Sequence, residues 1–362
     1  MKNKIILLVF ILFFLISTIT GCQDIFKLDG STTYESHPTS VSYTISYGYR
    51  INCTGSGKYS VFYKCDIPEV LNGGISDLII HNEDYYNEII ATWNSVKSWN
   101  ITSSLNKVYN LGITASVQAD SLIINDLNGE NALSIKEIKE LYPDLISKFT
   151  KSQSNDTTVF IDPKNPEISN IANQVLLNSD TNNSFIVAKD LFKWLKQNTD
   201  YKTHFGSDNV QSAIYTLQLT TGDCDDLSFL YISLCRSLNI PSRFVRGFLV
   251  EKNNAIPHAW AEVFVGGNLG VNGWIPVECA GISSSVESEI HQNFGIEDVG
   301  HLRLFKDDGS NESINISLSG VRYKMFSSNR NIDASAYSKI LNYQVLRNQK
   351  LVIDGNNKRN YE

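Results

Sequence analysis

The sequence predicts an α+β fold in which one helix, with a cysteine at its start, packs on an antiparallel sheet and follows a mainly-β N-terminal domain. Apolar residues recur at helical spacing between residues 225 and 238, as Leu227, Leu230, Tyr231, Leu234 and Leu238. Asn239 and Pro241 mark the end of this helix. From about residue 31 to 125, and again after residue 242, β-branched and aromatic residues alternate with small ones, as they do in strands.

The N-terminus has the features of a lipoprotein signal peptide. Lys2 and Lys4 precede an uninterrupted apolar run over residues 5–16, and Ile-Thr-Gly-Cys at residues 19–22 resembles the site cut by lipoprotein signal peptidase. We expect the mature chain to begin at Cys22 with lipid on its sulfur, so that the protein is extracytoplasmic and anchored to the cell membrane. The alternative is an uncleaved membrane anchor with an incidental cysteine.

The region before residue 160 is expected to be mainly β. Cys53 and Cys65 flank a Gly-rich segment between two alternating runs, a pattern typical of a β-hairpin. Because an exported protein can form disulfides, we expect Cys53 and Cys65 to form one across this hairpin. Residues 84–99 fit either a helix or a pair of strands, and both interpretations stay open.

The predicted central helix begins at or beside Cys224. A thiol on the first turn of a helix lies near unpaired backbone N–H groups and the positive end of the helix dipole, which favour the thiolate and can hold an oxyanion. Neighbouring carboxylates act in the opposite sense, because their negative charge raises the pKa of a thiol. These carboxylates belong to Asp223, Asp225 and Asp226. Activation of the cysteine therefore requires a cationic partner.

The next two predicted strands supply a base and an acid. His258 begins an alternating run to Val265, in which small residues on one face let a helix pack closely. A short strand over residues 273–278 then ends in Glu278. Cysteine, histidine and a carboxylate are the groups of a thiolate–imidazolium nucleophile steered by a third side chain. Glu262 is the other candidate acid, but four residues along a strand is about 13 Å from His258, so Glu278 is preferred.

Three motifs, GDCDD at residues 222–226, HAW at 258–260 and Trp-x-Pro-x-Glu at 274–278, resemble the transglutaminase-like superfamily. The resemblance covers about residues 165–281. It implies a papain-like α+β core with a Cys-His-Asp triad, in which Cys224 is the nucleophile, His258 the base and acid, and Glu278 the orienting carboxylate. The family usually has Asp where this chain has Glu278, so the extra methylene moves the carboxylate.

The length of 362 residues suffices for two or three domains. A new helical register after Pro163 and Pro166 marks the main boundary. We expect the residues after 325 to be an extension whose end, 355–362, is disordered. The predicted organisation is a signal peptide at 1–21, a linker at 22–30, a mainly-β domain at 31–160, a transglutaminase-like catalytic domain at 161–325 and a C-terminal extension at 326–362.

Composition narrows the range of partners. The net charge is −7 and no Lys/Arg cluster is present, so we expect no nucleic-acid partner. A metal held by Cys224, His258 and a carboxylate is disfavoured, because no CxxC or HxxxH spacing supports it, and no cofactor is expected. The other histidines occur singly and are expected to be exposed: His37, His81, His204, His291 and His301.

The sequence thus predicts a membrane-anchored thiol enzyme that acts on peptide, isopeptide or glutamine side-chain amide bonds through an acyl-enzyme thioester. Water as the second nucleophile would make it a peptidase or amidase, and an amine would make it a cross-linking acyltransferase. Hydrolysis of a protein or peptide substrate, such as a cell-surface polymer, is favoured for a solitary anchored domain. The alternative is a non-catalytic adhesion or assembly protein that uses the transglutaminase-like core as a binding module.

Overall fold

The computed structural model describes residues 30–203, 210–317 and 320–362. The predicted signal peptide, the lipidation site Cys22 and His204 lie outside these residues. Within them, no helix combines the length and the apolar character that crossing a bilayer requires.

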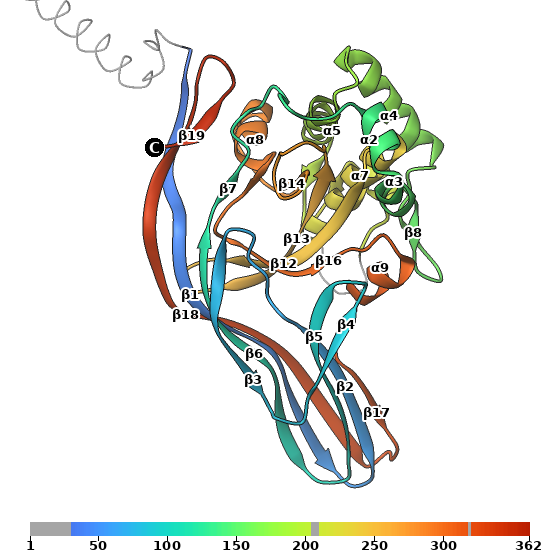
Figure 1. Cartoon of the computed structure of the whole chain (residues 1–362). Coiled ribbons are helices and arrows are strands. Elements are labelled where there is room, and N and C mark those ends of the chain that lie inside the picture. Colours follow the sequence, from blue (N-terminus) through green and yellow to red (C-terminus); the bar gives the residue numbers. More distant parts are fainter. Residues whose placement is uncertain (1–29, 204–209, 318–319) are drawn as a thin grey trace, which may run out of the picture.

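Two antiparallel sheets form the β-rich part of the molecule, in the lower half of Figure 1 and along its left side. The larger sheet has the order β19, β18, β1, β6, β3, with bounds Arg359–Tyr361, Arg330–Ile353, Thr32–Gly55, Lys107–Asp120 and Gly73–His81. The smaller sheet has the order β17, β2, β5, β4, with bounds Arg322–Met325, Tyr59–Asp66, Asn94–Ser103 and Tyr86–Ile90. Residues 84–99, for which two interpretations were open, thus form the strand pair β4 and β5.

The two ends of the described chain meet in the larger sheet. Strand β1 pairs with β18 along almost its whole length, from Thr32 opposite Ile353 to Gly55 opposite Arg330. Every second residue of the β1 segment 41–47 is buried, which is the period-2 pattern of a strand with one face on a core. The predicted disorder of residues 355–362 is therefore wrong, because residues 359–361 form β19. Residues 330–353 of the predicted extension form β18, so both segments are strands of the N-terminal sheet.

The predicted disulfide is also wrong, because Cys53 and Cys65 are free and buried. Strands β1 and β2 are consecutive but belong to different sheets. Cys53 lies two residues before the end of β1, whereas Cys65 lies six residues after the start of β2. At about 3.3 Å per residue these positions are roughly 7 and 20 Å from the connection, so the thiols do not face each other.

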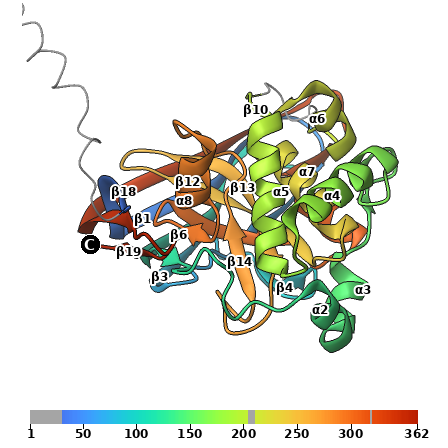
Figure 2. The ribbon, with the colours of Figure 1, turned by 90° about the horizontal axis from the view of Figure 1, so that it is seen from above.

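The helical part of the molecule packs around a third sheet, which has the order β14, β13, β12, β16 (Figure 2). The bounds of these strands are Trp274–Val277, Ala255–Phe264, Ser242–Val250 and His301–Lys306. The helices are α2 (Ile135–Leu141), α3 (Pro143–Phe149), α4 (Pro166–Ser179), α5 (Ser184–Asn198), α6 (Ala213–Leu219), α7 (Cys224–Ser237), α8 (Val286–Asn293) and α9 (Asn311–Ser317). Short pairs complete the fold: β8 (Gln153–Ser154) with β9 (Val159–Ile161), β10 (Asp200–Tyr201) with β11 (Thr221–Gly222), and β7 (Leu122–Ile123) with β15 (Ile296–Glu297).

Helix α7 is the centre of this core. Eleven consecutive residues, 226–236, are buried, because α4, α5 and α6 cover the helix on one side and β12 and β13 on the other. Ala259, Ala261 and Val263 on β13 belong to the same core cluster as the α7 residues, so small side chains let the helix lie close to the strand, as the sequence predicts. Asn239 has φ 59°, the left-handed conformation expected just after the helix.

Candidate active site

The Cys224 thiol lies at the first residue of α7. The chain reaches it through β11, which pairs in parallel with β10 and so brings Tyr201 opposite Gly222. Gly222 approaches the helix so closely that a Cβ there would lie 2.7 Å from Cβ of Asp226 and 3.0 Å from a methyl group of Thr216. A residue without a side chain is therefore needed to seat the start of α7 and its sulfur.

The surroundings of Cys224 favour the neutral thiol. Burial, followed by the carboxylates of Asp225 and Asp223, raises the pKa of Cys224, and the backbone N–H of Ala259 acts against this rise. Burial and a hydrogen bond with Asp223 also raise the pKa of Asp225 to about 9. Cys224 therefore needs a base if it is to act as a nucleophile.

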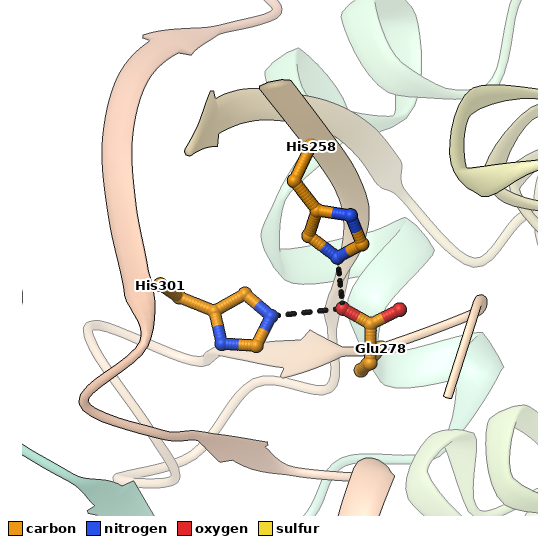
Figure 3. A group of neighbouring side chains, drawn as sticks. All are labelled: His258, Glu278 and His301. Atoms are coloured by element: carbon orange, nitrogen blue, oxygen red, sulfur yellow. Dashed lines mark hydrogen bonds and ion pairs between the residues drawn. The ribbon is translucent and has the colours of Figure 1, made fainter. Parts of the chain in front are cut away.

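His258 and Glu278 lie in direct contact (Figure 3). Nε2 of His258 on β13 donates to Oε2 of Glu278, the residue after β14, over 2.6 Å. The antiparallel pairing of β13 with β14 brings the two residues together across 20 positions of sequence. Because Nε2 bonds the carboxylate, Nδ1 is the ring nitrogen left to exchange a proton with a thiol.

Glu262, the other acid considered from the sequence, has a different environment. Its carboxylate lies 2.6 Å from Nε of Arg243 and 2.7 Å from Nη1 of Arg303, and it is 1% exposed. Burial opposes ionisation, but the two guanidinium groups outweigh it and lower the pKa of Glu262 to about 2. Glu262 is thus part of a buried ion-pair network, and Glu278 is the acid in contact with His258.

The Glu278 carboxylate is held by three donors. Oε1 accepts from the backbone N–H of Ala280 over 2.6 Å, and Oε2 accepts from both His258 and His301. Burial would raise the pKa of Glu278, but the two imidazoles outweigh it and hold the pKa well below its ordinary value. The group therefore remains an anion, with its position fixed, across the physiological range of pH.

His301 is the residue of this group that the sequence analysis missed. It is the first residue of β16 and 8% exposed, so the expectation that it is exposed is wrong. Nε2 lies 2.8 Å from Oε2 of Glu278, and Nδ1 lies 2.8 Å from Oδ1 of Asp298. The Asp298/His301 spacing is visible in the sequence, but the contact with Glu278 exists only because β16 pairs with β12. His291 is also buried, at 6% exposed, where exposure was expected.

A cavity of about 210 Å³ opens onto this group and is lined by His258, Glu278, Ala280, Asp298 and His301 among others. His258, Glu278 and His301 present ligand-type atoms within 4.8 Å of one another, and so do Asp223, Cys224 and Asp225. Hydrogen bonds at 2.6 and 2.8 Å already account for the arrangement of the first group. Both groups nonetheless contain the side chains that could hold a metal ion.

The Cys224 sulfur lies close to the backbone of the strand that carries His258. Ala259, whose N–H interacts with the Cys224 sulfur, directly follows His258 in β13. Within the described residues no hydrogen bond joins the thiol itself to the imidazole. Tyr201 is 39% exposed. Burial raises its pKa, and the charges of Cys224, Asp223 and Glu278 act in the same sense. Tyr201 therefore borders the site.

Comparison with known proteins identifies the core. Residues 170–279 match the model of the transglutaminase-like superfamily. An uncharacterized protein of Mycobacterium leprae is 26% identical over 114 residues, which are 29% of this chain and 39% of the relative, so the chain spans about two fifths of that protein.

Structural comparison also matches two solved structures. One, named "Putative Cysteine Protease" and obtained from Cytophaga hutchinsonii, is 14% identical with a TM-score of 0.49, and the match covers 87% of this chain and 100% of that one. The periplasmic domain of TgpA from Pseudomonas aeruginosa is 10% identical with a TM-score of 0.33, over 70% of this chain and 94% of that one.

Proposed function

From the premise that residues 170–279 form a transglutaminase-like domain, we propose that the protein is a thiol enzyme that attacks amide carbonyls, with Cys224 as nucleophile, His258 as base and acid, and Glu278 as orienting carboxylate. The contact that carries the proposal is the 2.6 Å hydrogen bond from His258 Nε2 to Glu278, next to a thiol at a helix N-terminus. A nucleophile, a base and a group that orients the base are the parts of such a site.

In the proposed reaction His258 Nδ1 takes the proton of the Cys224 thiol while the sulfur attacks the substrate carbonyl carbon. The carbonyl oxygen becomes an oxyanion, for which backbone N–H groups on the first turn of α7 are suitable donors. The C–N bond then breaks, His258 gives its proton to the leaving amine, and an acyl thioester remains. Water, deprotonated by His258, attacks the thioester, and the proton returns to sulfur as the acid product leaves.

Hydrolysis of peptide or isopeptide bonds is our first choice of reaction, with transfer to an amine as the variant of the same chemistry. Both use the same three side chains and differ in the second nucleophile. The proposed substrate is a protein or peptide, such as a cell-surface polymer, because the N-terminal sequence resembles a lipoprotein export signal. No cofactor enters this chemistry.

The reaction is tested by incubating the protein with peptide libraries, with and without a primary amine acceptor, and analysing the products by mass spectrometry. Cleaved peptides indicate a peptidase, released ammonia without cleavage indicates an amidase, and an amine adduct indicates an acyltransferase. Cys224→Ala is the matched control and should form none of these products. Equal product from wild type and Cys224→Ala would refute the proposal.

The membrane anchor is part of the same proposal. The lipoprotein-type motif ending at Cys22 supports lipid attachment and an extracytoplasmic location. Mass spectrometry of the mature N-terminus should find a chain that begins at Cys22 and carries acyl groups, and Cys22→Ser should remove them. A mature protein that begins at an unmodified Met1 would eliminate lipoprotein processing.

A second candidate function is a non-catalytic binding module. The observation in its favour is the raised pKa of Cys224, caused by burial and by the adjacent aspartates. A thiol of this kind is inert unless a base assists it. Iodoacetamide at pH 6 separates the two candidates: a base-assisted Cys224 reacts fast and selectively, whereas a binding module shows the slow kinetics of an ordinary thiol.

A further inference from the structure

Glu278 contacts a second histidine that a cysteine–histidine–acid triad does not require. His301 Nε2 lies 2.8 Å from the same oxygen, Oε2, that accepts from His258. The two imidazoles come from β13 and β16, which lie on opposite sides of β12, and converge on one carboxylate from two directions (Figure 3). The mechanism proposed above assigns no role to His301.

His301 is fixed at its other end by Asp298. Nδ1 of the ring lies 2.8 Å from Oδ1 of Asp298, and the same oxygen accepts from the backbone N–H of Gly300 over 2.8 Å. The edge of the His301 ring also packs against Trp260, with 4.9 Å between ring centroids. A buried ring with two hydrogen bonds and an aromatic neighbour has little freedom to rotate.

These contacts fix the charge of the ring. Ionised carboxylates are acceptors only, so a ring whose two nitrogens each bond one of them must carry a proton on both, and it is an imidazolium. The electrostatic environment agrees: burial would lower the pKa of His301, but Asp298 and Glu278 outweigh it and raise the pKa well above its ordinary value. A fixed positive charge therefore lies in contact with the acid that orients His258.

We propose that His301, held by Asp298, is a positioning residue that fixes the Glu278 carboxylate against His258 and partly neutralises its charge. This inference rests on the proposed function, since it assigns a role within the same site. The need for such a residue follows from Glu278 itself, because glutamate has one more rotatable bond than aspartate and its carboxylate must be held from more sides. The His301 imidazolium and the Ala280 N–H provide that restraint.

The charge has a second consequence, which is measurable. Without the imidazolium, the full charge of Glu278 would act on His258 and Cys224, favouring the protonated imidazole and disfavouring the thiolate. Both effects move activation of Cys224 to higher pH. The other titratable groups around the site are Tyr201, Asp223 and Asp225 on the thiol side, and Tyr343 and Tyr361 near Asp298.

The test measures the rate of Cys224 alkylation by iodoacetamide against pH, with peptide mass mapping to assign the label, in the wild type and three variants. His301→Gln keeps an N–H donor for Glu278 and removes the charge. We expect it to shift the acidic limb of the profile upward by about one pH unit, because it removes a unit charge whose ring centroid lies 5.5 Å from that of His258. Asp298→Asn should shift the limb in the same direction by less.

His81→Gln is the matched control. His81 also makes two side-chain hydrogen bonds, to Tyr337 and Thr114, both at 2.8 Å, but it lies in the five-stranded sheet, far from Cys224 in sequence and fold. Its profile should superimpose on that of the wild type. With a substrate in hand, His301→Gln should also lower kcat about tenfold with KM little changed, because His301 does not contact the reacting atoms.

The outcomes separate this inference from the proposed function. If wild-type Cys224 reacts like an ordinary thiol at every pH, the proposed function fails. If wild-type Cys224 is activated and both His301→Gln and Asp298→Asn match it, the role of His301 alone is refuted. If His301→Gln fails to fold, the alkylation profile of Asp298→Asn alone tests the role of His301. Nitrogen-15 NMR of the wild type at pH 7 gives an independent check: both ring nitrogens of His301 should be protonated, and a neutral ring would refute the inference.

Discussion

Two charged clusters meet at the sheet formed by β14, β13, β12 and β16, and they differ in the cation that they use. The arginine cluster consists of Arg243, Glu262, Glu297 and Arg303, and the histidine cluster of His258, Glu278, Asp298 and His301. Both draw residues from β13 and β16, and Trp260 links them, since its Nε1 donates to Glu297 and its ring packs on His301.

The difference between the clusters is the ability to release a proton. A guanidinium stays charged at every physiological pH, so the arginine cluster can hold the strands together but cannot take part in proton transfer. An imidazole exchanges its proton near neutrality. On the proposed function, one sheet therefore carries a structural ion-pair network beside a proton-transfer site, and substitutions should affect stability in the first and turnover in the second.

The largest expected effect on turnover comes from His258→Ala. Removing the general base and acid should lower kcat/KM by about 10³-fold, within the range that such groups contribute. Because His258 lies at the cavity and its ring is partly exposed, the melting temperature should change by only a few degrees. Steady-state kinetics and calorimetry on the same preparation check both expectations. A variant with unchanged kcat/KM would remove His258 from the mechanism.

The largest expected effect on stability comes from Arg303→Met. It leaves the buried Glu262 and Glu297 without their shared cation, and breaking a buried pair in this way costs about 3–5 kcal/mol of unfolding free energy. Denaturant unfolding measures the loss, and kcat per folded molecule should stay within a few-fold of wild type. The control is Arg347→Met: its guanidinium is 59% exposed and 3.9 Å from Asp120, so the change should be below about 1 kcal/mol.

A comparison of the two glutamates sharpens the distinction. Glu278→Gln keeps the shape of the side chain but removes the charge that supports the His258 imidazolium, so kcat should fall about 10²-fold with little change in unfolding free energy. Glu262→Gln should lower the unfolding free energy and leave kcat nearly unchanged, because it removes the negative charge that pairs with Arg243 and Arg303. Equal losses of kcat in the two variants would contradict the division of the sheet into two clusters.

The smallest expected effect is on the pH dependence of stability. The pKa of His301 is raised in the folded protein. Its contribution to the unfolding free energy is therefore complete below the pKa of the unfolded chain, about 6.5, and is lost as pH rises through the folded-state pKa. The slope is at most about 1.4 kcal/mol per pH unit for one proton. His301→Gln should flatten this alkaline loss, which denaturant titrations between pH 6 and 9 can measure.

At acidic pH both clusters should contribute less to the unfolding free energy. The pKa values of Glu278, Asp298 and Glu262 are lowered, so their contributions are present above about pH 4.5 and are lost as pH falls through the folded values, which is about 2 for Glu262. Arginine adds no loss on the alkaline side. An alkaline slope that is identical in wild type and His301→Gln would contradict the assignment of His301 as a cation in the folded protein.

Local features of the site could be predicted from the sequence. The start of α7 at Cys224 and its end before Asn239 follow from helical spacing and cap residues, and β13 and β14 follow from alternation. Three motifs in sequence order were enough to expect the transglutaminase-like core that the family match identifies. The choice of Glu278 over Glu262 needed only the length of a strand.

Features that depend on long-range pairing could not be predicted. Strand β18 joins β1 across almost the whole chain, so the residues after 325 gave no local sign that they complete the N-terminal sheet. Cys53 and Cys65 fitted a hairpin, but their strands enter different sheets. His301 was overlooked for the same reason, since a lone histidine acquires a partner in Glu278 only after β16 docks on β12.

The central claim, that Cys224 is a nucleophile activated by His258, is tested most directly by trapping the acyl-enzyme. The protein is mixed with p-nitrophenyl acetate at pH 7, quenched in acid and analysed by intact-mass and peptide-mapping mass spectrometry. We predict one acetyl group on Cys224, removed by hydroxylamine as a thioester should be, and formed at least about 10²-fold more slowly in His258→Ala. Acetylation of Cys224 at the same rate in both proteins, or no adduct on Cys224, would contradict the claim.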